Sequence, residues 1–160
     1  MHGRVLVVAA AHDTPSLPAP PPWTGMPVTP ARITWRLSTV GGVPIMERTA
    51  VDFRFHLPPE GQFWNVYERG SYQNMPVVGS FHYSSMPGRY LFRLTRRALD
   101  VSSLLPGTYA LTVTANDIRG NRGSLTVRFN VWRPGGSAGP SSRGGERRLR
   151  RHRGSPGRRR

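Results

Sequence analysis

The chain of 160 residues contains neither cysteine nor lysine, and its acidic side chains are few. Without cysteine, the protein has no disulfide, no thiolate nucleophile and no cysteine-based zinc site. Only eight Asp and Glu stand against 23 basic side chains, all of them Arg, so the formal net charge is +15. No apolar run approaches the ~20 residues that a membrane-spanning helix needs, and we therefore expect no membrane span.

Glycine and proline are abundant, with 18 and 16 residues. They interrupt nearly every stretch that could form an amphipathic helix, and this composition favours a loop-rich, all-β protein. Proline is densest in residues 14–30, TPSLPAPPPWTGMPVTP. Because proline favours extended backbone without a donor N–H, we expect a stiff connector there, with a ligand for an SH3-like groove as the alternative.

Apolar and polar side chains alternate in several short segments, which is typical of half-buried antiparallel strands. The segments are residues 32–37, 51–55, 90–94, 109–116 and 125–131. In the second of them, Val51, Phe53 and Phe55 are expected to face inward. A continuous apolar run at residues 5–10 resembles the core of a short signal peptide, but we favour a buried first strand.

The most regular pattern lies in residues 109–131. Two alternating segments flank a cluster of turn-forming residues, 117–123, so the sequence predicts a β-hairpin. Its inward stripe comprises Tyr109, Leu111, Val113 and Ala115 on one strand and Leu125, Val127, Phe129 and Val131 on the other. Asp117 could offer oxygen to Ca²⁺, but an Asx turn that closes the hairpin is favoured.

The composition changes at Arg133. Residues 133–160 hold ten Arg and one Glu, a net charge of 10 − 1 = +9, with Leu149 as the one large apolar residue. Such a segment buries too little apolar surface to offset the entropy of ordering, and we expect a disordered tail after a domain at residues 1–132. The charge predicts non-specific adhesion to polyanions, nucleic acid included.

Two short motifs indicate a fold class. LLPGTY at residues 104–109 resembles immunoglobulin-like and fibronectin-type-III sandwiches, in which a corner tyrosine bonds to upstream backbone. TANDIRGN at residues 114–121 is similar to the hairpin of bacterial immunoglobulin-like domains. The resemblance implies an immunoglobulin-like antiparallel β-sandwich with Tyr109 as its structural corner.

A broader resemblance spans residues 1–132. The fragments that carry it include WRL (35–37), VDF (51–53), LPP (57–59), FWNVYERGSYQN (63–74) and LPGTY (105–109). They are similar to the β-rich region downstream of the catalytic domain in secreted bacterial peptidoglycan hydrolases of the lysostaphin type. This implies an extracellular or cell-envelope location and a non-catalytic accessory role.

The zinc motifs of that family, H-x-x-x-D and H-x-H, do not occur in this chain. We therefore expect no metal, no cofactor and no catalytic residue, and the chain reads as a fragment of a peptidase without its catalytic domain. Ser80, Ser84 and Ser85 flank His82, but no G-x-S-x-G motif surrounds them, so a serine-rich loop is favoured over a nucleophile.

Residues 63–74 combine aromatic, amide and guanidinium side chains, a composition that suits binding to a glycan or a peptide. A core strand followed by a loop, with Trp64 and Tyr67 packed inside, is favoured for this segment. The binding hypothesis concerns its exposed edge, Arg69, Tyr72 and Gln73. The sequence thus predicts a binding or spacer module that contacts a cell-wall glycan or a neighbouring catalytic domain. The alternative is a nucleic-acid-binding protein that acts through the Arg-rich tail.

Overall fold

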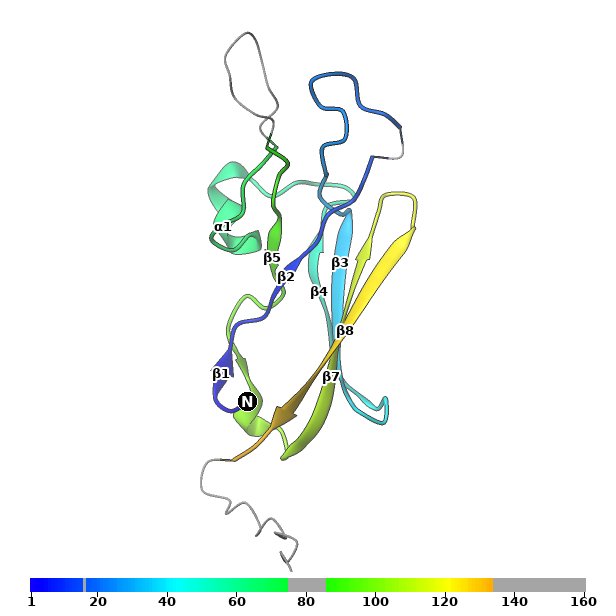
Figure 1. The fold of residues 1–160 in the computed structure, drawn as a ribbon. Coiled ribbons are helices and arrows are strands. Elements are labelled where there is room, and N and C mark those ends of the chain that lie inside the picture. Colours follow the sequence, from blue (N-terminus) through cyan, green and yellow to red (C-terminus); the bar gives the residue numbers. More distant parts are fainter. Residues whose placement is uncertain (16, 75–85, 134–160) are drawn as a thin grey trace, which may run out of the picture.

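The computed structural model describes residues 1–15, 17–74 and 86–133 (Figure 1). These residues are mostly β, with antiparallel strands and one short α-helix, α1 (Phe63–Val66), which follows a 3₁₀ turn, Glu60–Gln62. The strands are β1 (Arg4–Val5), β2 (Val8–Ala10), β3 (Arg32–Thr39), β4 (Pro44–Asp52), β5 (Leu91–Arg93), β6 (Leu99–Asp100), β7 (Gly107–Asn116) and β8 (Arg122–Val131). Except for Arg133, the predicted tail lies outside the described residues, as does the serine-rich segment around His82.

Four strands form the larger sheet in the order β4-β3-β7-β8. The predicted hairpin is confirmed, since β7 and β8 pair over their whole length with Leu111 opposite Val127. β3 also follows its predicted alternation, because Ile33, Trp35 and Leu37 are buried on one face. The opposite face is polar, and threonine hydroxyls of β7 bond to those of β8, as in the 2.8 Å contact of Thr112 with Thr126.

Two short pairs of strands, β1 with β6 and β2 with β5, pack against the apolar face of this sheet (Figure 1). The expected first strand is therefore two short strands, and it is half-buried rather than fully buried. Side chains at odd positions, such as Val7 and Ala9, contact the core, whereas Leu6 and Val8 are exposed. In a strand with one covered face and one open face, buried and exposed side chains alternate even when all the residues are apolar.

The core lies between the two layers. Phe92 and Leu94 are buried as the alternation at residues 90–94 predicted. Trp35 bridges the layers, because its indole N–H donates to the Leu94 carbonyl over 2.7 Å. At one end of the core, the ring of Tyr67 packs 5.0 Å from that of Phe92.

The prediction for residues 51–55 is wrong in part. β4 ends at Asp52, so Val51 is buried and Phe53 half-buried, but Phe55 is 78% exposed. Beyond the strand, the Arg54 N–H and side chain bond back to the Asp52 carboxylate. This local contact turns the chain away from the sheet, although the apolar alternation continues in the sequence.

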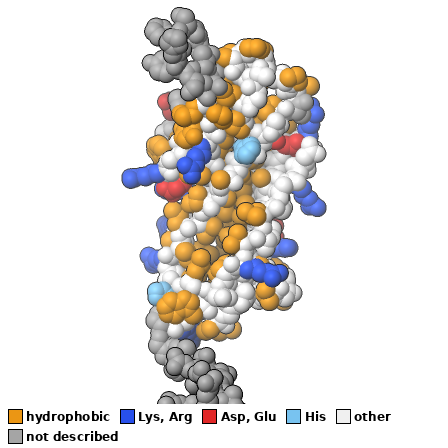
Figure 2. Space-filling model, viewed as in Figure 1, with side chains coloured by type: hydrophobic (Ala, Val, Ile, Leu, Met, Phe, Trp, Pro, Cys, Tyr) orange, Lys and Arg blue, Asp and Glu red, His pale blue; other side chains and the backbone are white. Residues whose placement is uncertain are grey.

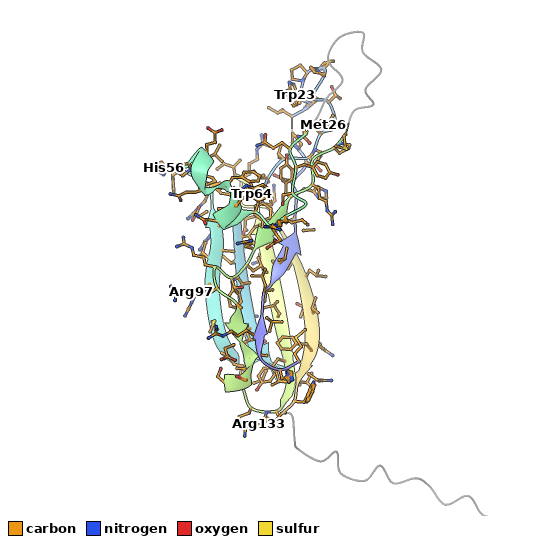
Figure 3. The ribbon with its side chains drawn as sticks, turned by 90° about the vertical axis from the view of Figure 1, so that its left-hand side faces the viewer. Trp23, Met26, His56, Trp64, Arg97 and Arg133 are labelled. Atoms are coloured by element: carbon orange, nitrogen blue, oxygen red, sulfur yellow. The ribbon has the colours of Figure 1, made fainter. Side chains whose placement is uncertain are left out.

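The Pro-rich residues 14–30 form a closed loop rather than a straight connector. The chain leaves the domain at Asp13 and returns at Val28, and these two residues exchange backbone hydrogen bonds of 2.7 and 2.8 Å. Met26 and Pro30 are buried near the end of the loop. Figure 3 places Trp23 and Met26 at the same end of the molecule.

Asp117 forms an Asx turn at the tip of the hairpin. Its carboxylate accepts hydrogen bonds from the backbone N–H groups of Arg119 and Asn121, over 2.8 and 2.7 Å. The amide of Asn121 donates to the second carboxylate oxygen. Within the described part of the chain, no three His, Cys, Asp or Glu side chains come together as metal ligands would.

Acid is expected to destabilise the fold through Asp52. The hydrogen bond from Arg54 is the main cause that lowers the pKa of Asp52 from 3.8 to about 2. A carboxylate with a lowered pKa stabilises the fold above its unfolded pKa, and the contribution disappears as the pH falls through the folded value. We expect the melting temperature to fall between pH 4 and pH 2 by less in Asp52→Asn than in the wild type. Equal pH dependence in both proteins would contradict this role.

Candidate functional site

The predicted binding residues Arg69, Tyr72 and Gln73 lie in the turn and extended segment that follow α1, and all three are exposed. Tyr72 is the least exposed, at 36%, because its backbone pairs with that of Arg89 through two hydrogen bonds of 2.9 Å. Gly70, with φ of +87°, permits the turn between them. None of the three predicted residues lines either of the two grooves described below.

The prediction that Trp64 lies in the core is wrong. Trp64 is 55% exposed, and its ring stands edge-on to that of Phe63 at 4.9 Å. Because residues 63–66 are helical, the side chains four positions apart share a face. Phe63 and Tyr67 therefore stack at 4.4 Å on the core side, and burial raises the pKa of Tyr67 to about 12.

A groove with basic walls runs between β4 and residues 93–100, and we call it the basic groove. Its volume is about 440 Å³. Arg48 of β4 lies on one wall, and Arg96 and Arg97, which follow β5, lie on the other; all three side chains are exposed. Arg97 projects on the side of the molecule where β4 lies (Figure 3). Arg93 also lines the groove, but its charge is balanced by Glu68, 2.9 Å away.

Thr95 lies between these arginines and is 7% exposed. Among the described residues, its hydroxyl oxygen has no hydrogen-bond partner. This oxygen is almost fully enclosed, so the polar groups open to the groove are the guanidinium groups around it. The groove is also lined by one carboxylate, Asp100, but the three exposed guanidinium groups outnumber it. Guanidinium groups are donors without acceptors, so this balance favours an anionic ligand. In the sequence, the signal for this groove is the pair of arginines in LTRRALD (residues 94–100), which were not among the predicted binding residues.

A second groove lies on another face, between β2 and β8, and we call it the apolar groove. Small side chains of residues 7–11 line one wall, and apolar side chains of β7 and β8 line the other, in a volume of about 580 Å³. Hydrophobic side chains gather along the middle of this face (Figure 2). Leu125 and Val127 share the predicted inward face, yet they are 68% and 51% exposed. The prediction that they are buried is wrong, because no described segment covers them.

Comparisons of the chain with models of protein families, with curated proteins and with solved structures return no match. No helix of the described residues is long and apolar enough to cross a membrane.

Proposed function

We propose that this chain is a non-catalytic binding module of a secreted bacterial cell-wall-associated protein, and that the basic groove binds an acidic cell-wall polymer. The observation that carries the proposal is the set of three exposed arginines, Arg48, Arg96 and Arg97, on the walls of one groove. The resemblance to accessory regions of peptidoglycan hydrolases supports the cell-wall context.

The chemistry of the groove favours phosphate or carboxylate groups on a polymer. Guanidinium groups form paired hydrogen bonds with both anions. Arg48 donates one N–H to the Glu47 carbonyl over 2.8 Å, which fixes part of its side chain at the wall. An open groove with exposed charges suits repeated, moderate contacts along a chain better than the enclosure of one small molecule.

We also propose that the architecture is an immunoglobulin-like sandwich. The four-stranded order β4-β3-β7-β8 matches the larger sheet of such domains, in which the two last strands form a hairpin beside two earlier ones. Tyr109 is buried near the start of β7, and its hydroxyl donates to the Leu105 carbonyl over 2.7 Å. This is the arrangement expected of a corner tyrosine.

The proposal includes a second binding surface, for a glycan or a neighbouring catalytic domain, formed by Arg69, Tyr72 and Gln73. Their segment is joined to the basic groove by Glu68, which binds the Arg69 N–H with one oxygen and the Arg93 side chain with the other, each over 2.9 Å. A polymer in the groove would thus pass near this surface.

Calorimetric titration with purified teichoic acid, a phosphate-rich polymer, tests the proposal. The double variant Arg96→Gln, Arg97→Gln should bind at least about tenfold more weakly, since a charge-assisted hydrogen bond contributes about 1.5–3 kcal/mol. The double variant Arg119→Gln, Arg122→Gln is the matched control, because it removes the same two charges from exposed arginines at the tip of the hairpin, outside the groove. Equal losses in both variants would mean that only net charge matters, and the proposed site would be wrong.

The alternative function, nucleic-acid binding through the tail, concerns residues that lie almost entirely outside the described ones. Removal of residues 134–160 separates the two functions. The shortened protein should keep its teichoic acid affinity and the Arg96 and Arg97 dependence, and lose its attraction to duplex DNA at 150 mM salt, a value on the order of physiological ionic strength. Retained DNA binding by the shortened protein would favour a nucleic-acid function of the folded part.

A further inference from the structure

The apolar groove plays no part in the proposed function, and two strand edges border it. One edge belongs to β2. The Leu94 N–H donates to the Val7 carbonyl over 2.9 Å, so Val7 and Ala9 direct their backbone groups toward β5. Successive residues of a strand direct these groups to opposite sides. The N–H and C=O groups of Val8 and Ala10 therefore point away from β5, along the rim of the groove.

The other edge belongs to β8. The Asp117 N–H donates to the Asn121 carbonyl at the turn, and the register of the hairpin continues from this bonded pair. Odd-numbered residues of β8 thus bond to β7, whereas Ser124, Thr126 and Arg128 direct their backbone groups outward. Among the described residues, β7 is the one strand paired with β8.

Met1 occupies the far end of the β8 edge. Its amino group donates to the Asn130 carbonyl, and the Trp132 N–H donates to the Met1 carbonyl over 3.2 Å. Met1 thus forms backbone hydrogen bonds with both neighbours of Val131, and this is the pattern of a parallel β-ladder. The ladder stops after this single step, and the unpaired edge beside the apolar groove begins at the next outward-facing residue, Arg128.

Apolar side chains and an unpaired strand edge occur together along this groove. Leu125 and Val127 are exposed on the same stretch of β8 whose backbone is unpaired. A small apolar molecule would cover the side chains but leave the backbone groups without partners. An extended polypeptide satisfies both, because alternate side chains enter the groove while its backbone bonds to the edge.

We propose that the apolar groove accepts an extended β-strand of another polypeptide, which runs parallel to β8 and continues the ladder that Met1 begins. Every second side chain of this strand is aliphatic and packs on Leu125 and Val127. The side chains between them are acidic or hydroxylic, because Arg122 and Arg128 project on the outer face of β8 beside them. This interaction is independent of the proposed polymer site.

Two other occupants fit less well. Residues 134–160 of the chain itself contain one large apolar residue, Leu149, and no alternating segment. A second copy that paired through β8 would place both copies of Arg122 and Arg128 along one seam, where like charges repel. An uncharged or acidic strand avoids this repulsion.

Amide hydrogen exchange of the ¹⁵N-labelled full chain tests the proposal. The probe is the synthetic peptide TVEVTVEV, and its control is VVTTEEVV, which has the same composition without the alternation. With the probe, the amides of Ser124, Thr126 and Arg128 should exchange at least about tenfold more slowly, because new backbone bonds protect them. The control peptide should leave them unchanged. The probe is also joined ahead of Met1 through one added threonine, which places its valines on the face of Leu125 and Val127, so that weak affinity does not hide the interaction.

No protection in the joined form would overturn the proposal. Protection confined to Val8 and Ala10 would overturn the assignment to β8, and concentration-dependent protection without any peptide would identify a second copy as the occupant. The double variant Leu125→Asp, Val127→Asp should lose the protection. Its folding is checked by the β3 amides.

The matched control is the double variant Leu105→Asp, Ile118→Asp, because both residues are exposed and apolar and neither lines the groove. This variant should keep the protection. Every variant of the apolar groove should bind teichoic acid as the wild type does. A failure of the strand-binding proposal can therefore be distinguished from a failure of the proposed polymer site.

Discussion

Replacing Trp35 by alanine is expected to lower the free energy of unfolding by about 3–5 kcal/mol, as for other fully buried aromatic side chains. Trp35 is buried in the centre of the larger sheet and contacts the second layer through its bond to Leu94. The free energy of unfolding of a domain of this size is about 5–15 kcal/mol in total. Mesophilic domains melt only some tens of degrees or less above about 37 °C, so the variant should be close to unfolding at that temperature. Urea denaturation followed by far-UV circular dichroism measures the difference.

Trp35→Phe separates packing from hydrogen bonding. It keeps most of the ring volume but leaves the Leu94 carbonyl without its indole donor, at a cost of about 1–3 kcal/mol. Trp132→Ala is the control, because Trp132 is exposed and its ring lies at a tilt to that of His2, outside the core. If Trp132→Ala destabilised the protein as much as Trp35→Ala, the assignment of the core would be wrong.

Replacing Tyr109 should have the second-largest effect. Tyr109→Ala removes a buried ring that stacks on Phe129 at 6.0 Å, and the expected loss is about 3–5 kcal/mol. Tyr109→Phe removes the hydroxyl bond to the Leu105 carbonyl alone, and the expected loss is about 0.5–1.5 kcal/mol.

Thermal denaturation of both Tyr109 variants checks these values, with Leu105→Ala as the control. The Leu105 side chain is exposed, so its truncation keeps the acceptor carbonyl and should be nearly neutral. A neutral Tyr109→Ala would show that this tyrosine does not fix the corner.

Secondary structure was predicted most accurately where the alternation and the turn-forming residues indicated the same element. In residues 109–131, two alternating segments and a dense turn cluster indicated one hairpin, and Asp117 forms the turn that its side chain allows. The alternation of Ile33, Trp35 and Leu37 likewise matched a strand in the middle of a sheet. Such a strand has neighbours on both sides, so its apolar face is covered throughout.

The errors arose where alternation and secondary structure disagree. Apolar residues alternate through Phe55, but the strand ends at Asp52 because Arg54 bonds back to it. Trp64 lies in a helical turn, where a period of two has no structural meaning. β4 itself begins at Pro44, and its first residues show no apolar alternation because most of them are exposed.

Alternation also identifies which side chains share a face, but not whether another layer covers that face. Leu125 and Val127 point toward the inter-layer side, as predicted, and remain exposed because the second layer stops at β2. The basic groove could not be predicted for a similar reason. Arg48 and Arg96 are far apart in the sequence, and only the packing of β4 near residues 93–100 places them on one groove.

Amide exchange along β8 in the free protein tests whether the strand edge beside the apolar groove is open, as it is among the described residues. The amides of Leu125 and Val127, which bond to β7, should exchange about a hundredfold more slowly than those of Ser124, Thr126 and Arg128, which face the rim. Dissolving the labelled protein in D₂O and following ¹H–¹⁵N spectra gives these rates. Uniform protection of all five amides would mean that the β8 edge is already paired, and the opposite alternation would mean that the other set of backbone groups faces the rim.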